Sequence, residues 1–122
     1  MMKVAVTTTD NYGGKAKISS RFGRAPYIAI IDVETQNLKF ISNSAANSSS
    51  GAGVKAAQII ADEEVEVLIV PRIGPKAFKG LEQAGLDIYI TQENTINEAL
   101  SEYQNDNLER IDEPTNPGHI GY

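Results

Sequence analysis

The sequence predicts a single α/β domain in which three helices accompany a five-stranded mixed sheet, in the order β-β-β-α-β-α-β-α. The length of 122 residues suits one domain. Five short segments are rich in β-branched and other apolar residues, and three longer segments repeat their apolar residues at helical spacing. Helix and strand alternate in the second half, which predicts parallel strands joined by right-handed crossovers.

The first half supplies three predicted strands and no helix. Residues 3–8 are rich in β-branched side chains. Residues 27–33 form a nearly continuous apolar run, which is typical of a central strand buried on both faces. Residues 38–42 alternate between apolar and polar side chains, and a tight turn at 34–37 makes the two segments a plausible hairpin.

A loop of Ser, Asn, Ala and Gly at 43–53 leads into a predicted helix at 52–64 and a strand at 65–70. One face of this helix carries the apolar residues that we expect to be buried, namely Val54, Ala57 and Ala61, with Ile60 beside them.

The next helix is predicted at 75–84, because Pro75 suits a first turn and Gly85 suits a C-terminal cap. We expect it to pack through Ala77, Phe78 and Leu81. The fifth strand is predicted at 86–90.

Thr95 and Glu98 fit a capping box at the start of the last helix, which runs to about Gln104. Its inward side is expected to hold Ile96, Ala99, Leu100 and Tyr103.

We assign the domain to residues 1–111 and expect 112–122 to be a flexible C-terminal tail, because it holds two prolines, two glycines and few apolar anchors. His119, the one histidine, falls in this tail and is not expected to be a ligand. Residues 93–113 are strongly acidic and are interpreted as a solvated helix face.

Composition excludes several classes of protein. A net charge of −5 argues against a general nucleic-acid coat. Without cysteine, neither disulfides nor thiolate metal sites can form. No apolar stretch approaches the roughly 20 residues that cross a bilayer, and the first residues do not resemble a signal peptide. We therefore expect a cytoplasmic protein with no nucleic-acid or membrane partner.

The order of elements brings most of the glycine-rich and arginine-containing loops to one edge of the sheet. If the first strand is parallel to the fourth and fifth, only the second is reversed. The four loops that follow the other strands then meet at one edge, at 8–26, 43–53, 71–75 and 91–95. Ligands of open α/β sheets bind outside the carboxyl ends of the strands.

Three loops at this edge are candidates for holding an anion. Arg21, Phe22, Gly23 and Arg24 combine guanidinium groups, which suit phosphates and other anions, with a glycine that permits close approach. The alternative is a surface loop with solvated arginines and Phe22 in the core.

Gly51 precedes a predicted helix and Gly53 lies in its first turn, where free N–H groups favour binding of an anion. Arg72 and Gly74 lie in a similar loop before the next helix. The alternatives are a plain helix start and a plain turn. Neither a Walker motif nor a dinucleotide fingerprint is present.

Catalytic arrangements are not apparent. Asp10, Asp32 and Asp62 are scattered along the chain, with no pair placed for acid–base work.

The sequence resembles the dinitrogenase iron–molybdenum cofactor biosynthesis family in four segments that occur in the same order. These are the loop Ser20–Tyr27, the helix start Gly51-Ala52-Gly53, and the segments 73–78 and 85–89. The resemblance covers residues 3 to 104. It implies a ribonuclease-H-like motif and a non-catalytic protein that binds or carries the iron–molybdenum cofactor or an iron–sulfur precursor for cofactor-assembly proteins.

Because the sequence offers no obvious iron ligands, such a cluster would be held mainly by its charge, through Arg21, Arg24, Arg72 and backbone N–H groups. Carboxylates are further candidates, and another small anion is the alternative cargo. Two other functions stay open. One is a regulatory module for a nucleotide or phosphorylated metabolite. The other is a metal-dependent nuclease, although residues 3–8 lack the carboxylate that such enzymes place in the first strand.

Overall fold

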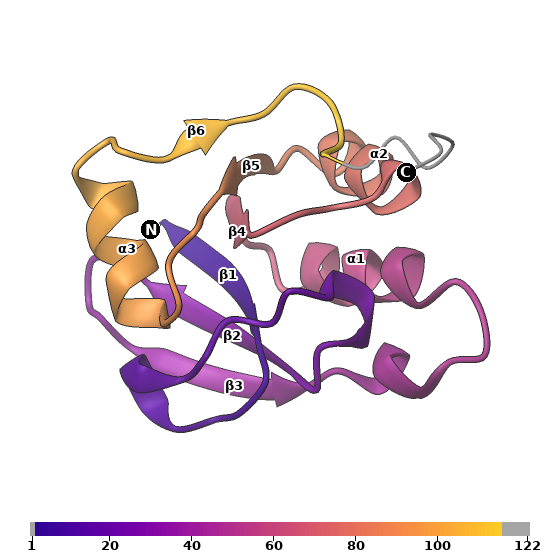
Figure 1. Ribbon diagram of the computed structural model, residues 1–122, viewed down its shortest axis with the longest axis horizontal. Coiled ribbons are helices and arrows are strands. Elements are labelled where there is room, and N and C mark those ends of the chain that lie inside the picture. Colours follow the sequence, from indigo (N-terminus) through magenta and orange to yellow (C-terminus); the bar gives the residue numbers. More distant parts are fainter. Residues whose placement is uncertain (1, 116–122) are drawn as a thin grey trace.

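The first strand lies in the interior of the sheet, with a neighbouring strand on each side (Figure 1). The computed structural model describes residues 2–115. Its sheet has the order β3-β2-β1-β4-β5-β6. The strands are β1 (Lys3–Thr8), β2 (Tyr27–Asp32), β3 (Leu38–Ser42), β4 (Val67–Val70), β5 (Asp87–Ile90) and β6 (Glu109–Arg110). The helices are α1 (Ala52–Asp62), α2 (Pro75–Gln83) and α3 (Ile96–Gln104), with 3-10 turns η1 (Gly13–Lys15), η2 (Phe22–Arg24) and η3 (Ser44–Asn47).

The predicted strand directions are confirmed. β1 is antiparallel to β2 and parallel to β4, β4 is parallel to β5, and β2 is antiparallel to β3. The three helices are confirmed as well, and the ends of the predicted elements differ from the observed ones by two residues at most. The carboxyl ends of β1, β3, β4 and β5 therefore share one edge.

The prediction of five strands is wrong, because β6 adds a sixth. It is a two-residue strand antiparallel to β5, with Arg110 opposite Tyr89. Both of its residues are exposed and charged, so it lacks the apolar alternation that marks a strand in sequence. Residues 105–113 are accordingly not part of a helix face, since α3 ends at Gln104.

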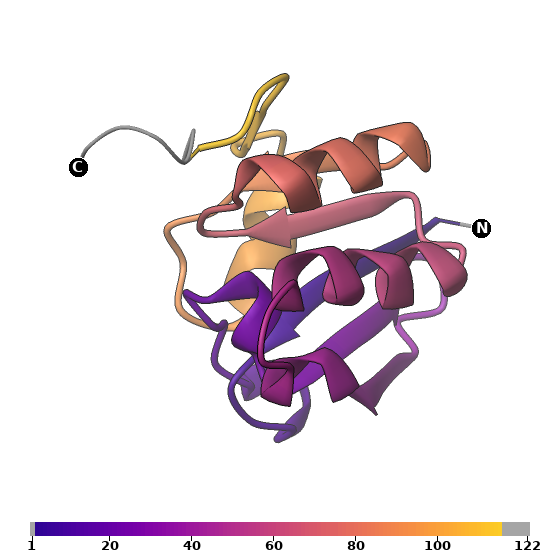
Figure 2. The ribbon, with the colours of Figure 1, turned by 90° about the vertical axis from the view of Figure 1, so that its right-hand side faces the viewer.

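Helices cover both faces of the sheet. α1 and α2 lie side by side on one face, and α3 lies on the other (Figures 1 and 2). Side chains of β1 alternate between the two cores: Ala5 packs under α1 and α2, whereas Val4 and Val6 pack with Ile96 and Ala99 of α3. Among the described residues, no helix is long and apolar enough to span a bilayer.

The predicted buried face of α1 is partly wrong. Val54 is 46% exposed and Ala61 is half-buried, whereas the buried residues are Ala52, Ala56, Ala57 and Ile60. Val54 instead lines a cavity at the start of the helix.

The ends of the other two helices are confirmed. Gly85 adopts a φ of 88°, and Leu86 N donates to Leu81 O, which together close α2. Thr95 and Glu98 form the predicted capping box.

Part of the predicted tail lies within the described residues. Thr115 Oγ1 accepts a hydrogen bond from Ile73 N at 2.8 Å and donates to Ile73 O at 3.1 Å, and Thr115 N also donates to Ile73 O. The end of the described chain is thereby fastened to the loop before α2. Residues 116–122, with His119, lie outside the described residues.

Candidate anion-binding site

A cavity of about 670 Å³ opens at the sheet edge where α1 and α2 begin. Figure 2 shows both helices starting near the tip of the β4 arrow. The cavity brings together all eight predicted site residues, namely Arg21, Phe22, Gly23, Arg24, Gly51, Gly53, Arg72 and Gly74. Ser20, Ala52, Val54, Ile73, Pro75, Lys76 and Ala77 complete its lining.

The loop containing Arg21 and Arg24 is docked directly on the start of α1. A Cβ built on Gly23 would lie 2.5 Å from Gly53 N and 2.7 Å from Ala52 C. Only glycine allows the two backbones to approach this closely. Phe22 is buried in the core below, as one of the two interpretations of this loop predicted, and also lines the cavity.

A buried asparagine holds the same loop from the other side. The Asn43 side chain donates to Ala25 O at 2.8 Å and to Gly23 O at 3.3 Å, and it accepts from Ala45 N. Buried polar groups need such partners, so this side chain fixes η2 relative to η3.

Arg24 has a structural role that the sequence did not indicate. Its Nη1 donates to Ala46 O at 3.0 Å and to Ser48 O at 2.5 Å. These bonds hold the loop before α1 and position the guanidinium group on that side of the cavity. Arg24 therefore has fewer free donors for a ligand than Arg21 or Arg72.

Both helices present uncapped N-termini to the cavity. Each is preceded by a glycine, Gly51 at a φ of 70° and Gly74 in extended conformation, and neither supplies a side-chain cap. A Cβ on Gly53 would lie 3.6 Å from Ala77 Cβ, so the first turns of α1 and α2 are in close proximity. Their first-turn N–H groups, which lack intrahelical acceptors, add partial positive charge here.

The lining is basic although the protein is acidic. It includes Arg21, Arg24, Arg72 and Lys76, whereas all sixteen acidic residues lie within 2–115 and none lines the cavity. Arg21 and Arg72 are exposed, and within the described chain their guanidinium groups have no hydrogen-bond or ion-pair partner. The arrangement can bind an anion through charge and N–H donors together.

Residues 2–115 contain no cluster of three or more His, Cys, Asp or Glu side chains able to hold a metal ion.

One predicted loop does not join the cavity. Residues 91–95 lie on the α3 side, where Ile18 N donates to Asn94 O at 2.9 Å and Lys17 forms an isolated bridge with Thr95. None of these residues lines the cavity, so a shared edge was not sufficient to bring all four loops together.

Lys76, Asn43 and Thr115 were missed from the sequence. Lys76 follows Pro75 in the first turn of α2. Because Pro75 marks the start of a helix in the sequence, the position of Lys76 beside the helix N-terminus could have been predicted. Asn43 and Thr115 act through partners 18 to 42 residues away, and no local pattern marks such pairs.

Comparisons with known proteins agree on one group of relatives. A model described as dinitrogenase iron–molybdenum cofactor matches residues 2–106. An uncharacterised protein of Methanocaldococcus jannaschii is 31% identical over 115 residues, which cover 92% of this chain and 93% of that protein.

Two solved structures are similar over nearly the whole chain. The apo form of the orange protein from Desulfovibrio gigas gives a TM-score of 0.89 at 30% identity, covering 94% of this chain and 97% of that one. A Thermotoga protein provisionally described as NifB gives 0.82 at 30% identity, covering 97% and 100%.

Proposed function

The chain belongs to the dinitrogenase iron–molybdenum cofactor family, and from this premise we propose that it is a small non-catalytic protein that holds an anionic metal cluster. The cluster would be of the iron–molybdenum cofactor or iron–sulfur precursor type, and the role would be accessory to cofactor assembly. The orange protein, a similar structure, is described in its apo form, a term that implies a ligand-bound form of that protein.

The observation that carries this proposal is the composition of the cavity. Four basic side chains and two uncapped helix starts line it, and no acidic side chain does. This lining contrasts with the net charge of −5 of the whole chain, and it is matched to a ligand with several negative charges.

Binding would rest on charge and hydrogen bonds rather than on metal–ligand bonds. Arg21 and Arg72 have free guanidinium donors, and the first-turn amides of α1 and α2 supply further N–H groups. Cluster sulfur atoms accept such hydrogen bonds, so the cluster would be retained without a covalent link. A cluster held in this way can also be handed on to an assembly protein.

The test is anaerobic mixing of the purified apo-protein with an extruded iron–molybdenum or iron–sulfur cluster, followed by gel filtration and metal analysis. We expect iron to co-elute with the protein. Elution of the protein without metal would contradict the proposal.

A regulatory module for a nucleotide or phosphorylated metabolite is the second candidate, because uncapped helix starts also bind phosphate. A thermal-shift comparison distinguishes the two, since stabilisation by ATP but not by clusters would favour the module. The nuclease alternative is less favoured, because β1 carries no carboxylate. Cleavage of an RNA–DNA hybrid with Mg²⁺ would revive it. A cytoplasmic location stays a prediction.

A further inference from the structure

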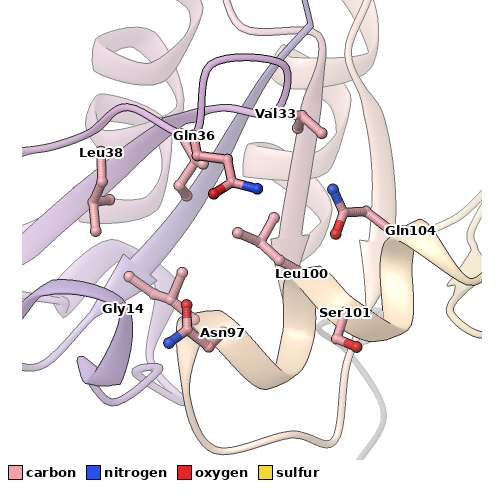
Figure 3. Close-up of a pocket in the computed structure, with 10 residues that line it drawn as sticks. Gly14, Val33, Gln36, Leu38, Asn97, Leu100, Ser101 and Gln104 are labelled. Carbon is pink, nitrogen blue, oxygen red and sulfur yellow. The ribbon is translucent and has the colours of Figure 1, made fainter.

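A second cavity, of about 460 Å³, lies on the opposite face of the sheet between α3 and the β2–β3 hairpin (Figure 3). It shares no residue with the anion-binding cavity. Its lining is Gly14, Ile31, Val33, Gln36, Leu38, Ile96, Asn97, Leu100, Ser101 and Gln104.

Charge separates the two cavities. No Asp, Glu, Lys or Arg among the described residues lines the second cavity. Aliphatic side chains form its inner wall: Ile31 and Ile96 are buried, and Leu100 is half-buried. A charged ligand would lose its hydration here without an opposite charge to replace it, so the cavity favours a neutral one.

Three carboxamides surround this wall. Gln36 extends from the hairpin and Gln104 from the end of α3, and their amide groups point toward one another across the opening, with Asn97 below (Figure 3). Within residues 2–115 none of the three side-chain amides has a hydrogen-bond partner. Each offers a donor and an acceptor side by side.

The backbone keeps a glutamine where a glycine would fit more easily. Gln36 has a φ of 64°, in the left-handed region that favours Gly and Asn. A glycine here would relieve the backbone but would remove the amide from the cavity.

Gly14 makes room for the lowest of the three amides. A Cβ at this position would overlap the carboxamide of Asn97. The absence of a side chain on Gly14 therefore allows Asn97 to occupy its position beside the cavity.

We propose that this cavity binds a small, uncharged, flat heterocycle with adjacent N–H and acceptor nitrogen or oxygen atoms, of the nucleobase type. Asn and Gln recognise adenine by bidentate hydrogen bonds to its edge, and the aliphatic wall suits the face of the ring. The volume lies in the range of small-molecule sites. This site does not depend on the proposed cluster-binding function.

The test is an NMR titration of the ¹⁵N-labelled protein with adenosine at up to millimolar concentration, with guanosine, uridine and AMP in parallel. We expect saturable shifts at Gln36, Asn97, Leu100 and Gln104. Gln36→Gly should weaken binding about tenfold, as expected for the loss of a bidentate contact, without lowering Tm. Asn97→Ala should also weaken it.

Glu64→Gly is the matched control. Glu64 has a φ of 57° and follows α1, away from the cavity, so its replacement should give the same backbone relief with unchanged adenosine affinity. Equal affinities of Gln36→Gly and the native protein would overturn the proposal. So would the absence of shifts with all three nucleosides, or binding of AMP alone with shifts confined to Arg21, Arg72 and their neighbours.

Discussion

Gly23 and Gly53 form a backbone contact that leaves no room for a side chain on Gly23, since a Cβ there would lie 2.5 Å from Gly53 N. The contact joins the arginine loop to the first turn of α1. The position of Arg21 relative to the amides of α1 therefore depends on a residue that has no side chain of its own.

Gly23→Ala should destabilise the protein by about 1–3 kcal/mol, because backbone rather than a flexible side chain would have to move. Urea unfolding measures this change. Gly53→Ala is the control, because its Cβ would meet Ala77 Cβ at an ordinary 3.6 Å and alanine favours a helix. An equal loss of stability in both variants would contradict the role assigned to the contact.

Replacing Arg21 and Arg72 by alanine should weaken binding of an extruded iron–sulfur cluster by about tenfold for each residue, the loss expected for a charged hydrogen bond. Higher salt should weaken binding to the native protein as well, because exposed charges are screened. Gel filtration with iron analysis at two salt concentrations measures both effects. Lys79→Ala removes a charge from α2 outside the cavity lining and should change little. Unchanged retention in the double variant would mean that the ligand binds elsewhere.

Thr115→Val should loosen the loop that carries Arg72. Valine keeps the shape of the side chain but leaves the buried Ile73 N without its 2.8 Å acceptor, at a cost of about 1 kcal/mol. Hydrogen exchange of the Ile73 amide should accelerate, and affinity for the anion should fall. Thr9→Val removes an exposed hydroxyl with only a 3.4 Å contact and serves as the comparison. Unaltered exchange at Ile73 would show that the hydroxyl does not hold this loop.

Ionisation of the Tyr103 phenol should lower the stability of the folded protein in alkaline solution. Burial, assisted by the charges of Tyr89 and Asp87, raises the pKa of Tyr103 above its usual 10.0. The folded state thus holds the phenolic proton to higher pH than the unfolded state. Its contribution is complete below pH 10 and is lost as pH rises through the raised pKa.

Urea unfolding between about pH 8 and 11 measures this loss. Tyr103→Phe should remove that part of the loss, although it also removes the hydrogen bond from Tyr103 Oη to Met2 Sδ. Tyr12→Phe, at a side chain that is 78% exposed, should keep the native pH profile. A native profile in Tyr103→Phe would contradict the assignment.

The strand directions were predictable because each crossover in the second half follows from the alternation of helix and strand. The cavity lining followed from those directions, since Arg21, Gly51 and Arg72 each lie in a loop after a strand or before a helix at the same edge. Local patterns and topology were enough for that part of the molecule.

Other features depend on contacts that no local pattern records. β6 is held by pairing with β5 and by the ion pair of Arg110 with Asp87, not by apolar alternation. In α1 the apolar spacing correctly marked Ala57 and Ile60 as buried, but it missed Ala52 and Ala56 and wrongly placed the exposed Val54 in the core. The second cavity arises where α3 meets the hairpin turn at Gln36, across about sixty residues of sequence.

The contrast between a basic cavity lining and a negative whole gives the molecule a pronounced electrical polarity. An approaching polyanion meets four basic side chains at this cavity although the whole chain carries a net charge of −5, and that attraction weakens as the ionic strength rises.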